Sequence, residues 1–192
     1  MARWRTERIS DASRNEAYIP PSAPILFVQS TFLPVPHVNI TYADKVLHYH
    51  LERYPEGIFF LYFSGRLYST QGLNERAVVQ FTAARDVQKE YVQLRHICVW
   101  DMSLCHLSLG NWKAAQEQFE VLLKESNWSK AVYNYAVGAT RWQAGDESDE
   151  TAAIINKTTS LMQRIAGKSI PLEVSRSQRI ASGLAIDVPL LS

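Results

Sequence analysis

The chain has 192 residues, of which 46% are hydrophobic, and its 20 Lys and Arg against 19 Asp and Glu give a formal net charge of +1. This composition excludes an intrinsically disordered chain, which has fewer apolar residues and a larger net charge. It also argues against a nucleic acid partner, because proteins that bind nucleic acid usually carry a basic excess. Two cysteines are too few for a disulfide framework, so we expect a reducing compartment.

Residues 1–38 are predicted to form an irregular, proline-rich leader. Five of the eight prolines of the chain fall in this segment: Pro20, Pro21, Pro24, Pro34 and Pro36. Proline removes a backbone donor and clashes inside a helix, so a regular helix is not expected here. The first 16 residues mix four arginines with three acidic residues and contain no apolar core, so neither a secretory signal nor a mitochondrial presequence is expected.

From Asn39 onward the apolar residues recur with a helical period, as at Ala43, Leu47 and Leu51. Further helices are predicted at about 57–71, 74–88, 91–109, 111–125, 128–144 and 147–165. Glycines lie at three of the joints, where a positive φ ends one helix before the next begins: Gly72, Gly110 and Gly145.

A repeat is visible in the spacing of these features. Ala77 and Phe81 recur 38 residues later as Ala115 and Phe119. The tetratricopeptide period is about 34 residues, with a small residue where the two helices of a hairpin cross and an aromatic residue between them. The crossing positions are predicted at Gly65, Ser103 and Gly138, and the Tyr site of the motif holds Tyr68, His106 and Arg141.

We therefore predict an all-α, tetratricopeptide-like helical-hairpin solenoid over residues 39–165. The alternative is a helical bundle whose spacing is accidental. Residues 166–192 form either a C-terminal tail or the start of a further, truncated helix.

Three segments are similar to a known family. Trp128-Ser129-Lys130-Ala131-Val132-Tyr133 and the run from Ile165 to Glu173, together with Tyr54-Pro55-Glu56-Gly57, resemble the tetratricopeptide-repeat protein 39 family, related to the yeast inclusion-body-clearance protein. The resemblance covers about residues 39–173. It implies a helical repeat protein without known catalytic activity that acts through protein partners, in lipid homeostasis or in clearance of aggregated protein.

The resemblance also implies a location and an extent. It implies a cytoplasmic protein, with peripheral association to lipid droplets, the endoplasmic reticulum or the mitochondrial outer surface. Family members continue for several more helices, so we expect a central fragment or a shortened member. An array cut short exposes an apolar end face, and we expect the isolated chain to self-associate.

The sequence contains no complete motif for phosphate binding, metal binding or catalysis. The run Ala166-Gly167-Lys168-Ser169 lacks the earlier glycine of a phosphate-binding loop, because position 162 is Met. Cys98 and Cys105 are expected to be buried thiols, since four-ligand spacing for a metal is absent. We predict no cofactor, no metal and no enzymatic activity.

The candidate partner-binding groove lies on the inner face of the first helix of each hairpin. Counting helical turns from the crossing positions predicts the groove residues Phe59, Tyr62, Arg66, Trp100, Leu104, Tyr135 and Trp142. An aromatic groove suits a helix or an extended peptide of a protein partner. The alternatives are a carrier or sensor of a hydrophobic small molecule, and plain packing of the stripe under other helices.

Overall fold

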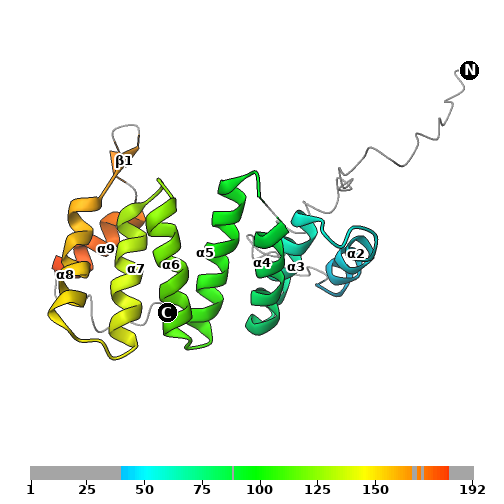
Figure 1. Ribbon diagram of the computed structural model, residues 1–192, viewed down its shortest axis with the longest axis horizontal. Helices are drawn as coiled ribbons and strands as arrows, with labels where there is room; N and C mark the ends of the chain where they lie inside the picture. The colour runs from blue at the N-terminus through cyan, green and yellow to red at the C-terminus, as the bar shows by residue number, and fades with distance from the viewer. Residues whose placement is uncertain (1–39, 88, 166–167, 170, 182–192) are drawn as a thin grey trace, which may run out of the picture.

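The computed structural model describes residues 40–87, 89–165, 168–169 and 171–181. The predicted leader, residues 1–38, lies outside the described residues. The described helices α2 to α8 stand side by side in a row (Figure 1). The elements are α2 (Ile40–Arg53), α3 (Ile58–Thr70), α4 (Asn74–Val87), α5 (Val92–Ser108), α6 (Trp112–Glu125), α7 (Lys130–Gln143), α8 (Asp149–Lys157), the 3-10 helix η1 (Thr158–Leu161), β1 (Arg164–Ile165), β2 (Lys168–Ser169) and α9 (Pro171–Ala181).

The helices pair into hairpins as the repeat predicts, with α3 on α4, α5 on α6 and α7 on α8. The three turn glycines have φ values of 75° at Gly72, 70° at Gly110 and 89° at Gly145. A side chain is strained in this left-handed region, which is why glycine ends the first helix of each hairpin. The all-α repeat fold is confirmed.

Close approach at the predicted crossing positions holds each hairpin together. A Cβ added at Gly65 would lie 2.7 Å from the ring of Phe81, and one added at Gly138 would lie 2.5 Å from Ile155 Cγ1. At the third crossing position the side chain of Ser103 is fully buried, and its hydroxyl donates to the Val99 carbonyl at 2.7 Å. Small residues therefore allow the two backbones of a hairpin to pack tightly.

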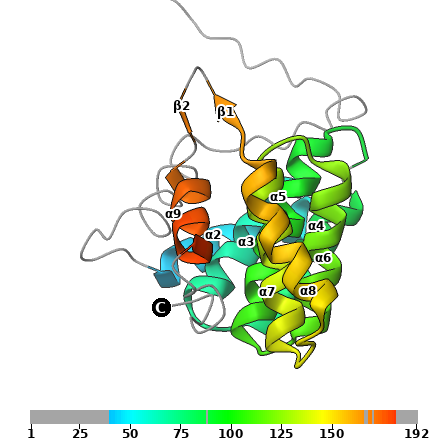
Figure 2. The same cartoon turned by 90° about the vertical axis from the view of Figure 1, so that its left-hand side faces the viewer.

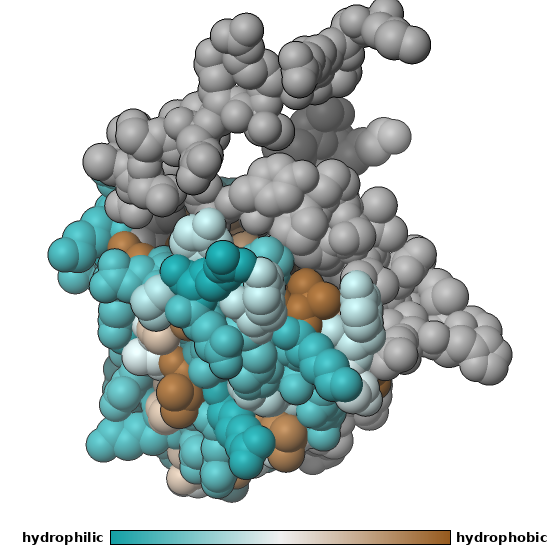
Figure 3. Space-filling model, turned by 90° about the vertical axis from the view of Figure 1, so that its right-hand side faces the viewer, coloured by the Kyte–Doolittle hydropathy of each residue, from teal (hydrophilic) through white to brown (hydrophobic). Residues whose placement is uncertain are grey.

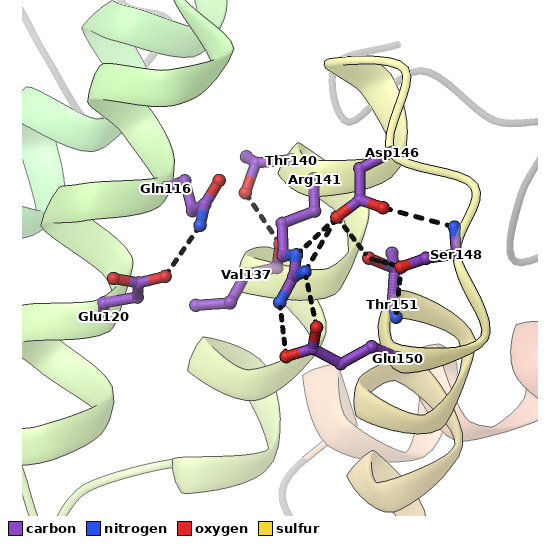
Figure 4. A network of polar contacts seen from close by, with 9 residues as sticks. All are labelled: Gln116, Glu120, Val137, Thr140, Arg141, Asp146, Ser148, Glu150 and Thr151. Carbon is purple, nitrogen blue, oxygen red and sulfur yellow. Dashed lines mark hydrogen bonds and ion pairs between the residues drawn. The ribbon is translucent and has the colours of Figure 1, made fainter.

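Ion pairs of Arg141 hold the α7–α8 turn at the position where the repeat motif has a tyrosine (Figure 4). The Arg141 guanidinium donates to Asp146 at 2.8 Å and to Glu150 at 3.2 and 3.3 Å. Asp146 also accepts from the Thr151 hydroxyl at 2.9 Å and from the Ser148 amide at 3.2 Å. Hydrogen bonds from Ser148, Arg141 and Thr151 hold the pKa of Asp146 well below its ordinary range.

Helix α8 is shorter than predicted. Residues 147–165 were expected to be one helix, but α8 ends at Lys157 and is followed by η1 and by the strand β1. Side chains compete with the helical ladder here, because Ser160 Oγ donates to the Lys157 carbonyl at 2.7 Å and Asn134 Nδ2 donates to the Ile154 carbonyl at 2.6 Å. The single helix over 147–165 is therefore wrong in its second half.

Beyond η1, the chain makes a small hairpin and a further helix. Strands β1 and β2 are antiparallel, with Arg164 opposite Ser169 and Ile165 opposite Lys168. Lys168 and Ser169 therefore lie in a β-strand, unlike those of a phosphate-binding loop, where they begin a helix. A further helix, α9 at 171–181, lies to the side of α7 and α8 (Figure 2).

The N-terminal end of the described array is α2, which buries Ala43 and Leu47 against α3, keeps Leu51 partly buried, and exposes Tyr42 and Tyr49. Figure 3 views this end and shows a mainly hydrophilic surface with separate apolar side chains.

Candidate functional site

The seven predicted groove residues lie on the first helices of the hairpins, α3, α5 and α7, but they differ in exposure. Phe59 is 44% exposed, and five residues are partly buried: Tyr62, Arg66, Trp100, Leu104 and Trp142. Tyr135 is only 3% exposed. The structure therefore does not bring all seven to one open surface.

Tyr62 and Arg66 meet at a buried carboxylate that the sequence analysis did not single out. The Tyr62 hydroxyl donates to Asp101 at 2.7 Å, and the Arg66 guanidinium donates to the same carboxylate at 3.0 Å. Asp101 is 5% exposed. These contacts join α3 to α5, so the polar ends of Tyr62 and Arg66 hold two neighbouring hairpins in register.

Burial dominates the electrostatics of this cluster. Burial raises the pKa of Asp101, and the nearby Arg66 and the hydrogen bond from Tyr62 act in the opposite direction. Burial and the Asp101 carboxylate raise the pKa of Tyr62 above its ordinary value. Burial also raises the pKa of the Cys98 thiol to about 12, so this thiol stays protonated and unreactive near neutral pH.

Tyr135 and Ala139 are covered by the chain itself. Both pack in one apolar cluster with Ile155 of α8, and Ile180 of α9 packs against that cluster. The inner face of the third hairpin is therefore interior at these positions, and Tyr135 belongs to the packing rather than to an open groove. The sequence analysis gave packing of the stripe under other helices as an alternative, but it did not place α9.

An open pocket lies between α5 and the start of α7, and we call it the Trp128 pocket. Its volume is about 480 Å³, and it is lined by Gln93, His96, Ile97, Trp100, Ser126, Trp128, Val132 and Tyr133. Trp128 is 61% exposed and Ile97 is 45% exposed, so apolar surface faces solvent at the rim. Exposed apolar surface of this kind marks interaction sites in folded proteins.

The floor of the Trp128 pocket is aromatic packing. The Trp100 ring meets the rings of Phe119 and Tyr133 edge-on, with centroids 5.8 Å apart in both pairs. Trp100 therefore both supports the core between α5, α6 and α7 and offers one face to the pocket. Of the seven predicted groove residues, Trp100 alone lines the pocket.

Trp128 is the pocket residue that the groove prediction missed. It lies in the loop between α6 and α7, whereas the prediction counted helical turns along the first helices only. Its segment was singled out for its family resemblance, and an exposed tryptophan within that segment was the available signal.

Among the described residues, no group of three His, Cys, Asp or Glu side chains is placed to hold a metal ion. Cys98 and Cys105 are both buried free thiols. A search of the described helices finds none with the length and apolar character needed to span a membrane.

Comparison with known proteins identifies the fold family. Residues 24–182 match the family described as Iml2/Tetratricopeptide repeat protein 39. A relative, Tetratricopeptide repeat protein ttc-39B of Caenorhabditis elegans, is 31% identical over 125 residues, which cover 62% of this chain and 22% of the relative. No solved structure matches. The family match extends over most of the chain, including every described helix, and the chain belongs to the Iml2/Tetratricopeptide repeat protein 39 family.

Proposed function

We propose that this chain is a non-catalytic scaffold that binds a protein partner in the Trp128 pocket. The observation that carries the proposal is an apolar hollow of about 480 Å³ with Trp128 61% exposed and Ile97 45% exposed at its rim. Tryptophan is enriched among the residues that dominate binding energy, because it buries a large area and offers a polar N–H.

The size of the pocket suits one or two large apolar side chains of a partner. A helix presents such side chains one turn apart, and an extended peptide presents them at alternate positions. The rigid backing of Trp100 by Phe119 and Tyr133 means that the floor is formed before the partner arrives, which lowers the entropic cost of binding.

Site-specific photo-crosslinking tests this proposal. A photoreactive amino acid is placed at position 97 or 128 of the chain in cells, and at Val79 of α4 as a control, which is 64% exposed but does not line the pocket. We expect the same protein to be captured from positions 97 and 128 and not from 79. Equal capture from all three positions would contradict the assignment.

A carrier or sensor of a hydrophobic small molecule is the second candidate. An enclosed cavity would favour it, whereas the exposed Trp128 and Ile97 place this pocket at the surface. Native mass spectrometry of the purified chain separates the two: a bound lipid that is lost on Trp128→Ala would support the carrier.

The cellular role follows from the family resemblance. We propose that the chain acts in lipid homeostasis or in clearance of aggregated protein, in the cytoplasm and at the surface of lipid droplets, the endoplasmic reticulum or mitochondria. The matched residues cover 22% of the length of the nematode relative, so the roles of a whole family member are proposals for this chain.

A further inference from the structure

The loop that carries Trp128 is fixed by side chains from a distant part of the sequence. Gln163, which follows η1, accepts from the Ser129 amide at 3.2 Å through Oε1. The same side chain donates to the Asn127 carbonyl at 3.3 Å through Nε2. One glutamine therefore holds the backbone on both sides of Trp128.

A buried glutamate completes this contact. Glu173 of α9 is fully buried. It accepts from the Ser129 hydroxyl at 3.0 Å and from the backbone N–H of Gln163 at 2.8 Å. Its two carboxylate oxygens thus join α9, the segment after η1 and the start of α7. A buried carboxylate destabilises the fold unless hydrogen bonds satisfy it. Movement of α9 away from α7 would therefore break both hydrogen bonds of Glu173 together.

Ser129 needs such support because of its backbone. Its φ of 50° lies in the left-handed region, and it is the one described non-glycine residue with a positive φ. A non-glycine residue keeps that conformation only where its surroundings determine it. Ser129 is 1% exposed and is held from both its amide and its hydroxyl.

We propose that Gln163 and Glu173 are positioning residues for the Trp128 pocket, so that docking of α9 sets the shape of the partner site. The effect on partner binding rests on the proposed function, whereas the effect on the structure of the Trp128 loop does not. When α9 is docked, the loop presents Trp128 beside Ile97 and Val132. When α9 is displaced, Ser129 is released and the rim of the pocket is lost.

Two of the three segments that carry the family resemblance meet at this contact, since Ser129 belongs to one and Glu173 to the other. Ser129 and Glu173 are 44 residues apart in the chain, so the sequence alone does not indicate their contact. Coupling between α9 and the pocket gives both a physical reason to be present in one protein.

Amide hydrogen–deuterium exchange of the whole 192-residue chain in deuterium oxide tests the proposal without knowledge of the partner. In Gln163→Ala and in Glu173→Ala we expect exchange of the Trp128 and Ser129 amides to rise about tenfold or more, with exchange in the middle of α5 unchanged. Glu173→Gln keeps one acceptor oxygen and is expected to restore part of the protection.

The matched control is Ser148→Ala, which removes one hydrogen-bonded cap at the opposite end of the α7–α8 hairpin. It is expected to raise exchange at the start of α8 and to leave the Trp128 loop protected. Loop exchange equal to the parent in both Gln163→Ala and Glu173→Ala would overturn the proposal, as would equal deprotection of the loop in Ser148→Ala.

Photo-crosslinking from position 97 then measures the effect on partner binding. We expect Gln163→Ala to lower the yield of crosslinked partner several-fold. Loop deprotection with an unchanged yield would overturn the link to the partner site. A parent chain that captures no partner from position 97 would contradict the proposed function, while the exchange result would still decide the geometry.

Discussion

Replacing Gly65 by alanine separates tight packing at the crossing from ordinary helix propensity. In a helix interior, glycine to alanine normally stabilises by up to about 1 kcal/mol. Here the added Cβ would lie 2.7 Å from two ring atoms of Phe81 and 3.0 Å from a third. Phe81 is fully buried and its ring also lies against Tyr62, at 5.7 Å between centroids, so the ring has little room to move.

Overpacking of a filled core costs about 1–3 kcal/mol, so the clash outweighs the propensity gain. We expect Gly65→Ala to lower the free energy of unfolding by about 1–2 kcal/mol, after the propensity gain is subtracted. For a chain of this size the melting temperature falls by about 2–8 °C, measured by circular dichroism at 222 nm.

A double-mutant cycle with Phe81→Val assigns the cause. Valine has no atom beyond Cγ, so the atoms that meet the new methyl group are gone. Adding Gly65→Ala to Phe81→Val should then be neutral or stabilising, which corresponds to a coupling of about 1–3 kcal/mol. A Gly65→Ala chain that melts above the parent would refute the crossing geometry.

Three further changes test other parts of the fold. Ala77→Leu adds bulk at a fully buried position and should lower the free energy of unfolding by about 1–3 kcal/mol in urea denaturation, whereas unchanged unfolding would count against the repeat register. Asp146→Asn should lower the melting temperature at pH 7, and the difference from the parent should narrow below about pH 4. The lowered pKa of Asp146 in the folded chain gives stability that is present above its unfolded pKa and is lost as pH falls. A difference in melting temperature that does not change with pH would contradict this. Trp100→Ala should cost about 3 kcal/mol through its lost contacts with Phe119 and Tyr133, and a melting temperature equal to that of the parent would show that these contacts do not support the core.

The hairpin array could be predicted from the sequence because its signals are local. The positive φ at Gly72, Gly110 and Gly145 and the close approaches at Gly65 and Gly138 each follow from one residue type at one repeat position. Predicting these features requires only the repeat period and the physical reason for a small residue at each position.

The site was less predictable because it depends on segments far apart in the chain. The carboxylate that binds Tyr62 comes from position 101, and the apolar cluster around Tyr135 includes Ile155 of α8, with Ile180 of α9 packed against it. The rim of the pocket, Trp128, lies in a loop to which no helical period applies. Counting turns along single helices therefore found the floor of the pocket at Trp100 but not its rim at Trp128.

The central claim is that a protein partner binds at the Trp128 pocket, and Trp128→Ala tests it most directly. Trp128 is 61% exposed, so its loss should change the free energy of unfolding by less than about 1 kcal/mol. Tyr42→Ala, at a residue 52% exposed on α2, is the control for loss of an exposed aromatic ring.

The measurement is the affinity of the crosslinked partner for the parent, Trp128→Ala and Tyr42→Ala chains, with melting recorded on the same samples. The account predicts a loss of more than about fivefold, or about 1 kcal/mol, for Trp128→Ala alone, with melting close to the parent. Equal affinity of all three chains would contradict it.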